Sequence, residues 1–200
     1  MGQPQAQLKE FWTVEEYLEF EKTSLVRHEY VDGQIFAMAG ESKNHNRLAG
    51  DVNSRLNDLL FGSGCEAFIE NVKVKVSSTR YYYPDVIVSC SEPIEDEDAY
   101  IIEDPILIVE VLSKTTTRND RVEKMNAYQN LHSLREYVII AQDRTRIEIY
   151  RHQQAGETWQ CEAFTDPEQE VFLASVGAKI KLADLYRRVR FPAITEEEEE

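Results

Sequence analysis

The segment Ile106–Leu112, "ILIVEVL", constrains the fold of this chain more strongly than any other stretch of its sequence. Its side chains are nearly all apolar, which is typical of a central β-strand covered on both faces. Glu110 is the exception within it. Because an unpaired carboxylate is costly in an apolar interior, we expect the fold to place a compensating partner opposite Glu110. That partner is either structural or part of a chemical site.

The patterns before this strand predict two helices and several strands. Thr13 and Glu16 have the spacing of a capping box at the start of a helix in "FWTVEEYLEF". Asp32 and Gly33 lie between two runs of alternating apolar residues, which predicts a β-hairpin. Further expectations are a second helix within residues 42–64 with an apolar stripe of Leu48, Val52, Leu56, Leu59 and Leu60, a half-exposed strand in "AFIENVKVKVS", and a strand that follows Pro84.

The patterns after this strand predict a helix at Asn119–Leu131 and a hairpin about Asp143 and Arg144. Late strands are expected in "WQCEAF" and "EVFLASVGAKIKL", and a short helix in "LADLYRRV". The whole pattern predicts an α+β fold, close to α/β, in which helices flank a mixed β-sheet. An N-terminal helix and β-hairpin precede that sheet, and extra C-terminal strands follow it.

Length and composition indicate one domain. The 200 residues, 42% of them hydrophobic, suffice for one sizeable core, and we assign it to residues 11–192. Residues 1–10 are predicted to be a flexible N-terminus, and residues 193–200 a disordered acidic tail.

The net charge of −15 argues at first against a nucleic-acid partner. The acids are concentrated, however. Five of them form the tail Glu196–Glu200, and seven lie in the expected loop from Glu92 to Asp104, which leaves −3 for the rest of the chain. The acidity is therefore local, which weakens the objection to DNA without removing it.

The three cysteines, Cys65, Cys90 and Cys161, are scattered and lack the spacing of a metal site. They are expected to be ordinary buried thiols of a cytoplasmic protein. No apolar run approaches the ~20 residues of a membrane span, so no membrane association is expected. The N-terminus also lacks the pattern of a signal peptide.

Asp85 and Glu110 are the candidate centre of a chemical site. Asp85 begins one strand, and Glu110 lies in the next long one. Two carboxylates on neighbouring strands that point the same way repel each other, and a magnesium ion between them would resolve the repulsion. Two structural alternatives stay open: Asp85 as a turn residue after Pro84, and Glu110 in a buried salt bridge with Arg121 or Lys124.

Seven pieces in order carry a resemblance to a known family. They are "TVEEYLEF", "HEYVDGQIFAMAG", "HNRLAGDV", "YYPDVIV", "LIVEVLSKTT", "RNDRVEKMNAY" and "REYVII". A Pro-Asp pair followed about 25 residues later by a glutamate in an apolar strand resembles the PD-(D/E)XK nuclease superfamily. Over roughly residues 11 to 190 the chain more closely resembles its Uma-type family of restriction endonucleases. The resemblance implies a restriction-endonuclease-like core and an endonuclease that uses magnesium, or manganese, to hydrolyse DNA phosphodiester bonds.

The resemblance also implies roles for particular residues. Asp85 and Glu110 ligate the metal, with the backbone carbonyl of Val111 as a third ligand. The superfamily's E-x-K lysine falls on Leu112 here, and the Uma-type pattern instead supplies a lysine from the following helix, Lys124. Glu29 joins the metal site directly or through water.

Supporting candidates surround these residues. Asp120, Lys124 and Tyr128 have the i, i+4, i+8 spacing of one helical side. Lys114 competes with Lys124 for the lysine role, and His45 could reach the site from the start of its helix. The structural alternative for Lys124 is an ordinary surface pair with Asp120.

A second function remains open beside the nuclease. The acidic charge and the missing E-x-K lysine are also compatible with a catalytically inactive relic of the fold that acts as a dimeric binding protein. A homodimer is expected in either case, because two-fold arrangements are the commonest oligomers.

Overall fold

The computed structural model describes residues 9–91, 100–112, 118–151 and 158–191, and the side chains of residues 118–120 are not among them. Residues 1–8 of the expected flexible N-terminus and the whole acidic tail lie outside this part. The helices and strands are α1 (Val14–Thr23), β1 (His28–Val31), β2 (Gln34–Ala37), α2 (Lys43–Leu60), β3 (Glu66–Ile69), β4 (Lys73–Ser77), β5 (Arg80–Tyr82), β6 (Val86–Ser89), β7 (Ile101–Ile102), β8 (Pro105–Leu112), α3 (Arg118–Tyr128), β9 (Glu136–Ala141), β10 (Ile147–Arg151), β11 (Gln160–Phe164), β12 (Glu170–Leu173), β13 (Ala178–Lys181) and α4 (Leu182–Tyr186).

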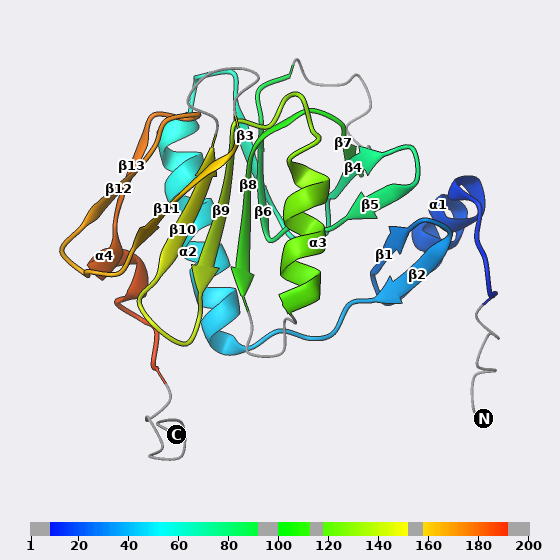
Figure 1. Ribbon diagram of the computed structural model, residues 1–200, viewed down its shortest axis with the longest axis horizontal. Helices are drawn as coiled ribbons and strands as arrows, with labels where there is room; N and C mark the ends of the chain where they lie inside the picture. The colour runs from blue at the N-terminus through cyan, green and yellow to red at the C-terminus, as the bar shows by residue number, and fades with distance from the viewer. Residues whose placement is uncertain (1–8, 92–99, 113–117, 152–157, 192–200) are drawn as a thin grey trace.

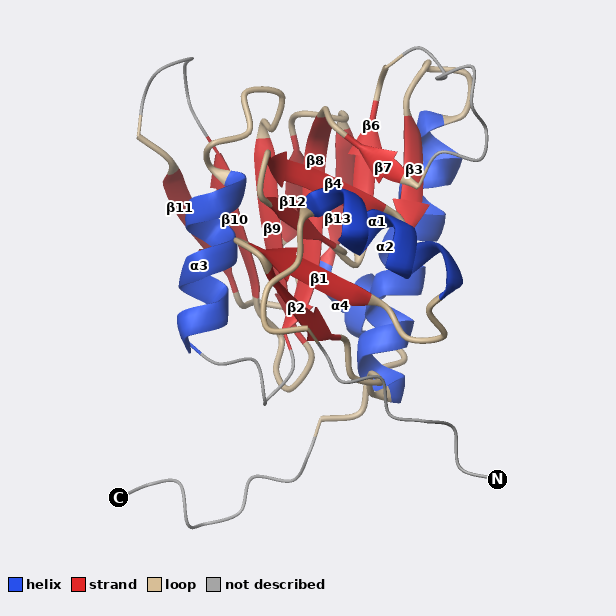
Figure 2. Ribbon diagram, turned by 90° about the vertical axis from the view of Figure 1, so that its right-hand side faces the viewer, coloured by secondary structure: helices blue, strands red, loops and turns tan. Residues whose placement is uncertain are grey.

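A six-stranded sheet in the order β11-β10-β9-β8-β6-β3 forms the centre of the fold (Figure 1). Its β8–β9 pair is parallel and its other pairs are antiparallel, so the sheet is mixed as expected. A five-stranded sheet, β2-β1-β5-β4-β7, crosses in front of it in Figure 2, and β12 and β13 pair separately. The expected α+β class is confirmed.

Two cores cover the two faces of β8. On one face α2, β12, β13 and α4 pack over Leu107, Val109 and Val111. On the other face α3, β4 and β5 pack over the row that contains Ile108. Glu110 alternates with Val109 and Val111, so it shares the face of Ile108 and of α3. The prediction of a central strand that is covered on both faces is confirmed.

The N-terminal helix and hairpin form as the sequence predicts. Thr13 and Glu16 make a reciprocal capping box at the start of α1. Asp32 and Gly33 adopt φ angles of 48° and 94°, the left-handed pair that a tight two-residue hairpin requires. Strand β1 then pairs with β5, and this pairing holds the N-terminal elements against the rest of the fold.

Three expectations about local structure are wrong. "AFIENVKVKVS" is not one strand, because Glu70 and Asn71 turn the chain at φ angles of 49° and 29°; β3 and β4 therefore belong to different sheets. Leu59, assigned to the apolar stripe of α2, is 54% exposed, whereas Leu56 and Leu60 are buried. The expected acidic loop ends in β7 instead of running uninterrupted to Asp104, and its residues 92–99 lie outside the described part.

The cysteines also differ from expectation. Cys65 and Cys90 extend the β3–β6 pairing by one residue and are joined by a disulfide. Cys161 is a free thiol but is exposed on β11, not buried. In the described residues, every helix is too short or too polar to traverse a lipid bilayer.

Glu136 at the start of β9 anchors the C-terminal hairpin. It is 2% exposed, and its carboxylate accepts hydrogen bonds from the backbone amides of Ala174 and Ser175 at 3.1 and 2.8 Å. Arg151 pairs with the same carboxylate at 3.2 Å. One buried carboxylate thus provides hydrogen-bond acceptors for the backbone amides of the turn between β12 and β13. These two strands cover the face of the central sheet opposite α3.

Glu136→Gln should lower the free energy of unfolding by about 1.5–3 kcal/mol, because an amide cannot accept all of these bonds from a buried position. Urea denaturation followed by circular dichroism measures the change. Glu162→Gln is the matched control, since Glu162 pairs with the same Arg151 from an exposed position and should cost less than about 0.5 kcal/mol. Equal losses in the two variants would contradict the anchoring role.

Candidate active site

Asp85 and Glu110 lie side by side on two interior strands of the central sheet, where β6 begins and near the end of β8. The antiparallel register pairs Val86 of β6 with Val109 of β8. Asp85 precedes Val86 and Glu110 follows Val109, so the same register brings the two carboxylates together. Each residue is only 8% exposed. The pairing of two apolar strands therefore places two acids next to each other in a buried environment.

Asp85 is held by the backbone and by a histidine. Its Oδ2 accepts a hydrogen bond from the amide of Val111 at 2.6 Å, and its Oδ1 lies 3.0 Å from Nε2 of His45. His45 reaches this position because Ser42 caps α2 by accepting a hydrogen bond from the amide of His45, which fixes the first turn of the helix. The carboxylate therefore has a defined orientation.

Glu110 receives two donors from α3. Its Oε1 accepts hydrogen bonds from the hydroxyl of Tyr128 at 2.9 Å and from Nζ of Lys124 at 3.2 Å. Burial raises the pKa of Glu110 to about 7; Lys124 opposes this rise, and the negative charges of Asp85 and Glu29 add to it. Among the described residues, no hydrogen bond reaches its other oxygen, Oε2.

Lys124 links two carboxylates from distant parts of the chain. Its ammonium lies 2.8 Å from Oε1 of Glu29 on β1 and 3.2 Å from Oε1 of Glu110 on β8. It also lies over the ring of Tyr82, 5.6 Å from the centroid. Burial disfavours the charge of Lys124, but Glu110 and Glu29 together hold its pKa well above the ordinary value. Lys124 therefore stays protonated between them.

His45 makes a second contact that we did not predict. Its Nδ1 lies 3.3 Å from Oε2 of Glu41 but makes no hydrogen bond, although the residue is 3% exposed. Burial disfavours the imidazolium, yet Asp85 and Glu41 raise the pKa of His45 above its ordinary value. The signal that we overlooked is the i, i+4 spacing of Glu41 and His45 at the start of a helix.

The structure brings most of the predicted residues together. A cleft of about 290 Å³ is lined by Glu29, His45, Asp85, Glu110 and Lys124. Tyr128 does not line the cleft, but its hydroxyl donates a hydrogen bond to Glu110. Lys114 and the side chain of Asp120 lie outside the described part, and the role of the Val111 carbonyl stays a prediction.

Arg121 is not the partner of Glu110. It binds Glu148 on β10 and donates to the hydroxyl of Tyr150 at 3.2 Å. Lys124 pairs with Glu110 in its place. The sequence left Arg121 and Lys124 open as salt-bridge partners of Glu110, and Lys124 is the one that pairs with it.

The donor set suits a magnesium ion better than a metal held by many side chains. Within the described ranges, no three Asp, Glu, His or Cys side chains form a preformed metal cluster. Magnesium usually needs only one or two carboxylates and keeps several waters. Asp85 and the second oxygen of Glu110 offer such a pair at a polar cleft. The site thus fits a hard divalent cation.

Comparisons with known proteins bear on the family and the fold of the chain. The sequence model of the Uma2 family, described as "Putative restriction endonuclease", matches residues 14–183. Two uncharacterized Synechocystis proteins, slr1290 and sll1609, are 32% and 36% identical over 88% and 70% of this chain, and over 92% and 80% of their own lengths. A crystal structure of a "putative nuclease belonging to DUF820" from Anabaena variabilis superposes with a TM-score of 0.72 at 21% identity, covering 88% of this chain and 97% of that one. That likeness confirms the fold.

The charges around Glu110 predict how its carboxyl group titrates in EDTA, where no metal ion is bound. The carboxyl group of Glu110 should titrate near pH 7. Asp85→Asn should lower its pKa by removing a negative neighbour, and Lys124→Met should raise it by removing a positive one. Carbon-13 NMR of the glutamate carboxyl groups across a pH series measures both shifts.

The surface pair of Lys22 and Glu19 provides the control. Lys22→Met should leave the midpoint of Glu110 where it is in the unmodified protein. A midpoint that falls or stays constant in Lys124→Met would show that Lys124 does not compensate Glu110.

Proposed function

The chain belongs to the Uma2 family, and we propose that it is a magnesium-dependent endonuclease that hydrolyses phosphodiester bonds of DNA. The observation that carries this proposal is the position of Lys124. Leu112 occupies the place of the lysine in the E-x-K pattern, but α3 supplies an ammonium group 3.2 Å from Glu110. An acid pair and a lysine therefore meet in one cleft although the sequence separates them.

Asp85 and Glu110 would hold the ion, with the Val111 carbonyl as a further ligand and Glu29 acting directly or through water. When bound, magnesium would supply the positive charge that neutralises a phosphate and acidifies water, and manganese can replace it. The related crystal structure from Anabaena variabilis is described as a "putative nuclease", which supports a nucleic-acid substrate.

The protein's own side chains would orient the reaction. Lys124 stays protonated, so its ammonium can donate hydrogen bonds to the attacking water and to a phosphate oxygen on which charge develops. Tyr128 fixes the rotamer of Glu110, and His45 fixes that of Asp85. These two partners keep the carboxylates in place, as outer partners of metal ligands commonly do.

An inactive relic of the fold is the second candidate. Its support is the same lysine, because Lys124 pairs with both Glu29 and Glu110 without any ion. In that case the ion pair is purely structural, and the protein would act by binding a partner. Metal binding and catalysis separate the two proposals.

Glu110→Gln should reduce DNA cleavage with magnesium at least about a hundredfold, because the variant loses a carboxylate charge from the site. Lys124→Gln should cost about 10²–10³-fold, the usual loss when one stabilising donor is removed. Cleavage of plasmid and linear DNA measures both, with circular dichroism to confirm folding. Glu123→Gln, an exposed neighbour of Lys124 outside the cleft, is the control. Full activity in Glu110→Gln would refute the assignment.

Calorimetry distinguishes the enzyme from the relic independently of any substrate. Manganese should bind the unmodified protein saturably, and Asp85→Asn should abolish the binding. Asp32→Asn is the matched control, because Asp32 pairs with Arg80 on the surface. The absence of saturable binding to the unmodified protein would favour the relic.

A further inference from the structure

Two buried acids lie in one row on the α3 face of the central sheet. The parallel register pairs Glu110 of β8 with Ile139 of β9, and the antiparallel register pairs Ile139 with Glu148 of β10. Residues that pair across a sheet point to the same face, so Glu148 lies on the face of Glu110, roughly 10 Å or two strand spacings away. Glu148 is 4% exposed and therefore needs compensation as Glu110 does.

Helix α3 provides one cation to each acid of this row. Lys124 pairs with Glu110. Arg121 in the same way pairs with Glu148. The two cations are three positions apart, a spacing at which side chains are neighbours on one side of a helix. In the strand order β10-β9-β8-β6, Arg121 thus reaches to one side of Glu110, and Asp85 lies on the other side.

The charge of Glu148 has more than one cation as its partner. Arg121 binds its Oε2, and Nε of Arg146 lies 2.8 Å from its Oε1. The hydroxyl of Tyr150 also donates to Oε2 at 2.9 Å. Within the described ranges, Glu148 is the only carboxylate that pairs with either arginine. Two guanidinium groups on one carboxylate leave one positive charge in excess.

This excess charge faces the cleft through Arg121. Arg121 lines the cleft, whereas Arg146 and Glu148 do not, and its side chain is 31% exposed. Both of its hydrogen bonds, to Glu148 and to the hydroxyl of Tyr150, use Nη2. The N–H groups of Nε and Nη1 therefore have no hydrogen-bond partner among the described residues. They can donate to a ligand in the cleft.

Arg121 differs in this respect from the other cation of α3 in the cleft. Lys124 lies between Glu29 and Glu110, which both line the cleft, so its charge is used within the lining. The carboxylate partner of Arg121 lies outside the lining and is also paired with Arg146. A negatively charged ligand that enters the cleft would therefore meet Arg121 as the more available cation.

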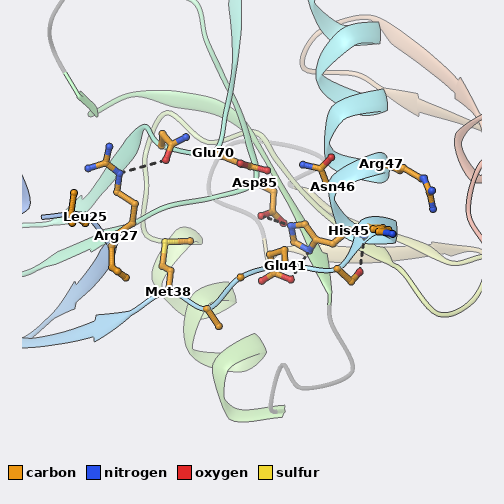
Figure 3. A pocket seen from close by; sticks show the side chains of 15 residues that line it. Leu25, Arg27, Met38, Glu41, His45, Asn46, Arg47, Glu70 and Asp85 are labelled. Atoms are coloured by element: carbon orange, nitrogen blue, oxygen red, sulfur yellow. Dashed lines mark hydrogen bonds and ion pairs between the residues drawn. The ribbon is translucent and has the colours of Figure 1, made fainter. Parts of the chain in front are cut away.

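The position of Arg121 along the cleft suits a neighbouring phosphate of a DNA strand. At Asp85 and His45 the cleft joins a larger hollow of about 740 Å³ (Figure 3). Arg121 lines the cleft but not the hollow, and Glu110 lies between Asp85 and Glu148 in the order of strands. A strand with its reacting phosphate at the acid pair can thus extend toward Arg121. Phosphates lie along the outside of a duplex and along a single strand alike, so both forms can make this contact.

We infer that Arg121 binds a backbone phosphate next to the scissile phosphate. The inference rests on the proposed function for the identity of the ligand as DNA, and it adds a residue that holds the substrate. Guanidinium groups form strong, charge-assisted hydrogen bonds with phosphate oxygens. A phosphate contact of this kind positions the strand and does not read its bases. Lys124 keeps its assignment to the reacting phosphate.

The first experiment measures binding of a labelled DNA duplex in EDTA, where no metal ion supports hydrolysis, by fluorescence anisotropy. Arg121→Gln should weaken binding about tenfold, the usual loss for one hydrogen bond to a charged group. The slope of log K against log salt should fall by about 0.9, as expected for one lost phosphate contact. Arg146→Gln is the matched control, because it removes the same charge from the same carboxylate outside the cleft. It should leave both quantities nearly unchanged.

The matched pair separates a phosphate contact from a structural ion pair. Equal weakening in the two variants, or unchanged affinity in Arg121→Gln, would overturn the inference. So would the absence of any DNA binding by the unmodified protein. Glu148 keeps one arginine in each variant, so both should fold, and thermal denaturation checks this. Arg121→Lys keeps the positive charge and should retain the salt slope of the unmodified protein; a slope as low as that of Arg121→Gln would contradict a charge contact.

The second experiment measures cleavage of the same DNA with magnesium. Arg121→Gln should raise KM about tenfold with little change in kcat, because it removes binding that the ground state and the transition state share. If the unmodified protein cuts DNA and Arg121→Gln raises KM no more than Arg146→Gln does, the inference fails and the nuclease proposal stands. If the unmodified protein binds DNA through Arg121 but cuts none, the nuclease proposal fails and the phosphate contact stands.

Discussion

The compensation of one buried carboxylate organises this site. Glu110 lies in the central strand of a sheet that is covered on both faces, where an isolated negative charge would be costly. Lys124 and Tyr128 supply that compensation from α3. The helix must therefore lie on the same face of the sheet as Glu110. Its apolar residues secure this position by packing against β8 and β9.

The negative charge of Glu110 is only partly compensated, and this leaves the site with a carboxyl group of perturbed pKa. Lys124 is shared with Glu29, and Asp85 adds a further negative charge, so the pKa of Glu110 stays raised. Groups with perturbed pKa values of this kind are commonly found at functional sites. The shared lysine is compatible with the ion and the phosphate that we propose for this site.

The folding of the N-terminal elements bears on this site as well as on stability. Pairing of β1 with β5 places Glu29 against Lys124. The loop between α1 and β1 also lines a larger hollow next to the cleft, through Leu25 and Arg27. The N-terminal helix and hairpin therefore help to complete the cleft.

Local sequence patterns were enough to predict the capping box at Thr13, the hairpin at Asp32 and Gly33, and the buried strand that holds Glu110. These depend on neighbouring residues, so periodicity and turn chemistry suffice to predict them. Selection of Lys124 relied on a family resemblance, because no local pattern measures the distance between a helix and a strand. The three-dimensional fold was needed to show that Lys124, not Arg121, pairs with Glu110. It was also needed to show that "AFIENVKVKVS" divides between two sheets, and that Glu41 and Asp85 line one hollow. Those outcomes depend on packing between segments far apart in the chain, which no single stretch of sequence encodes.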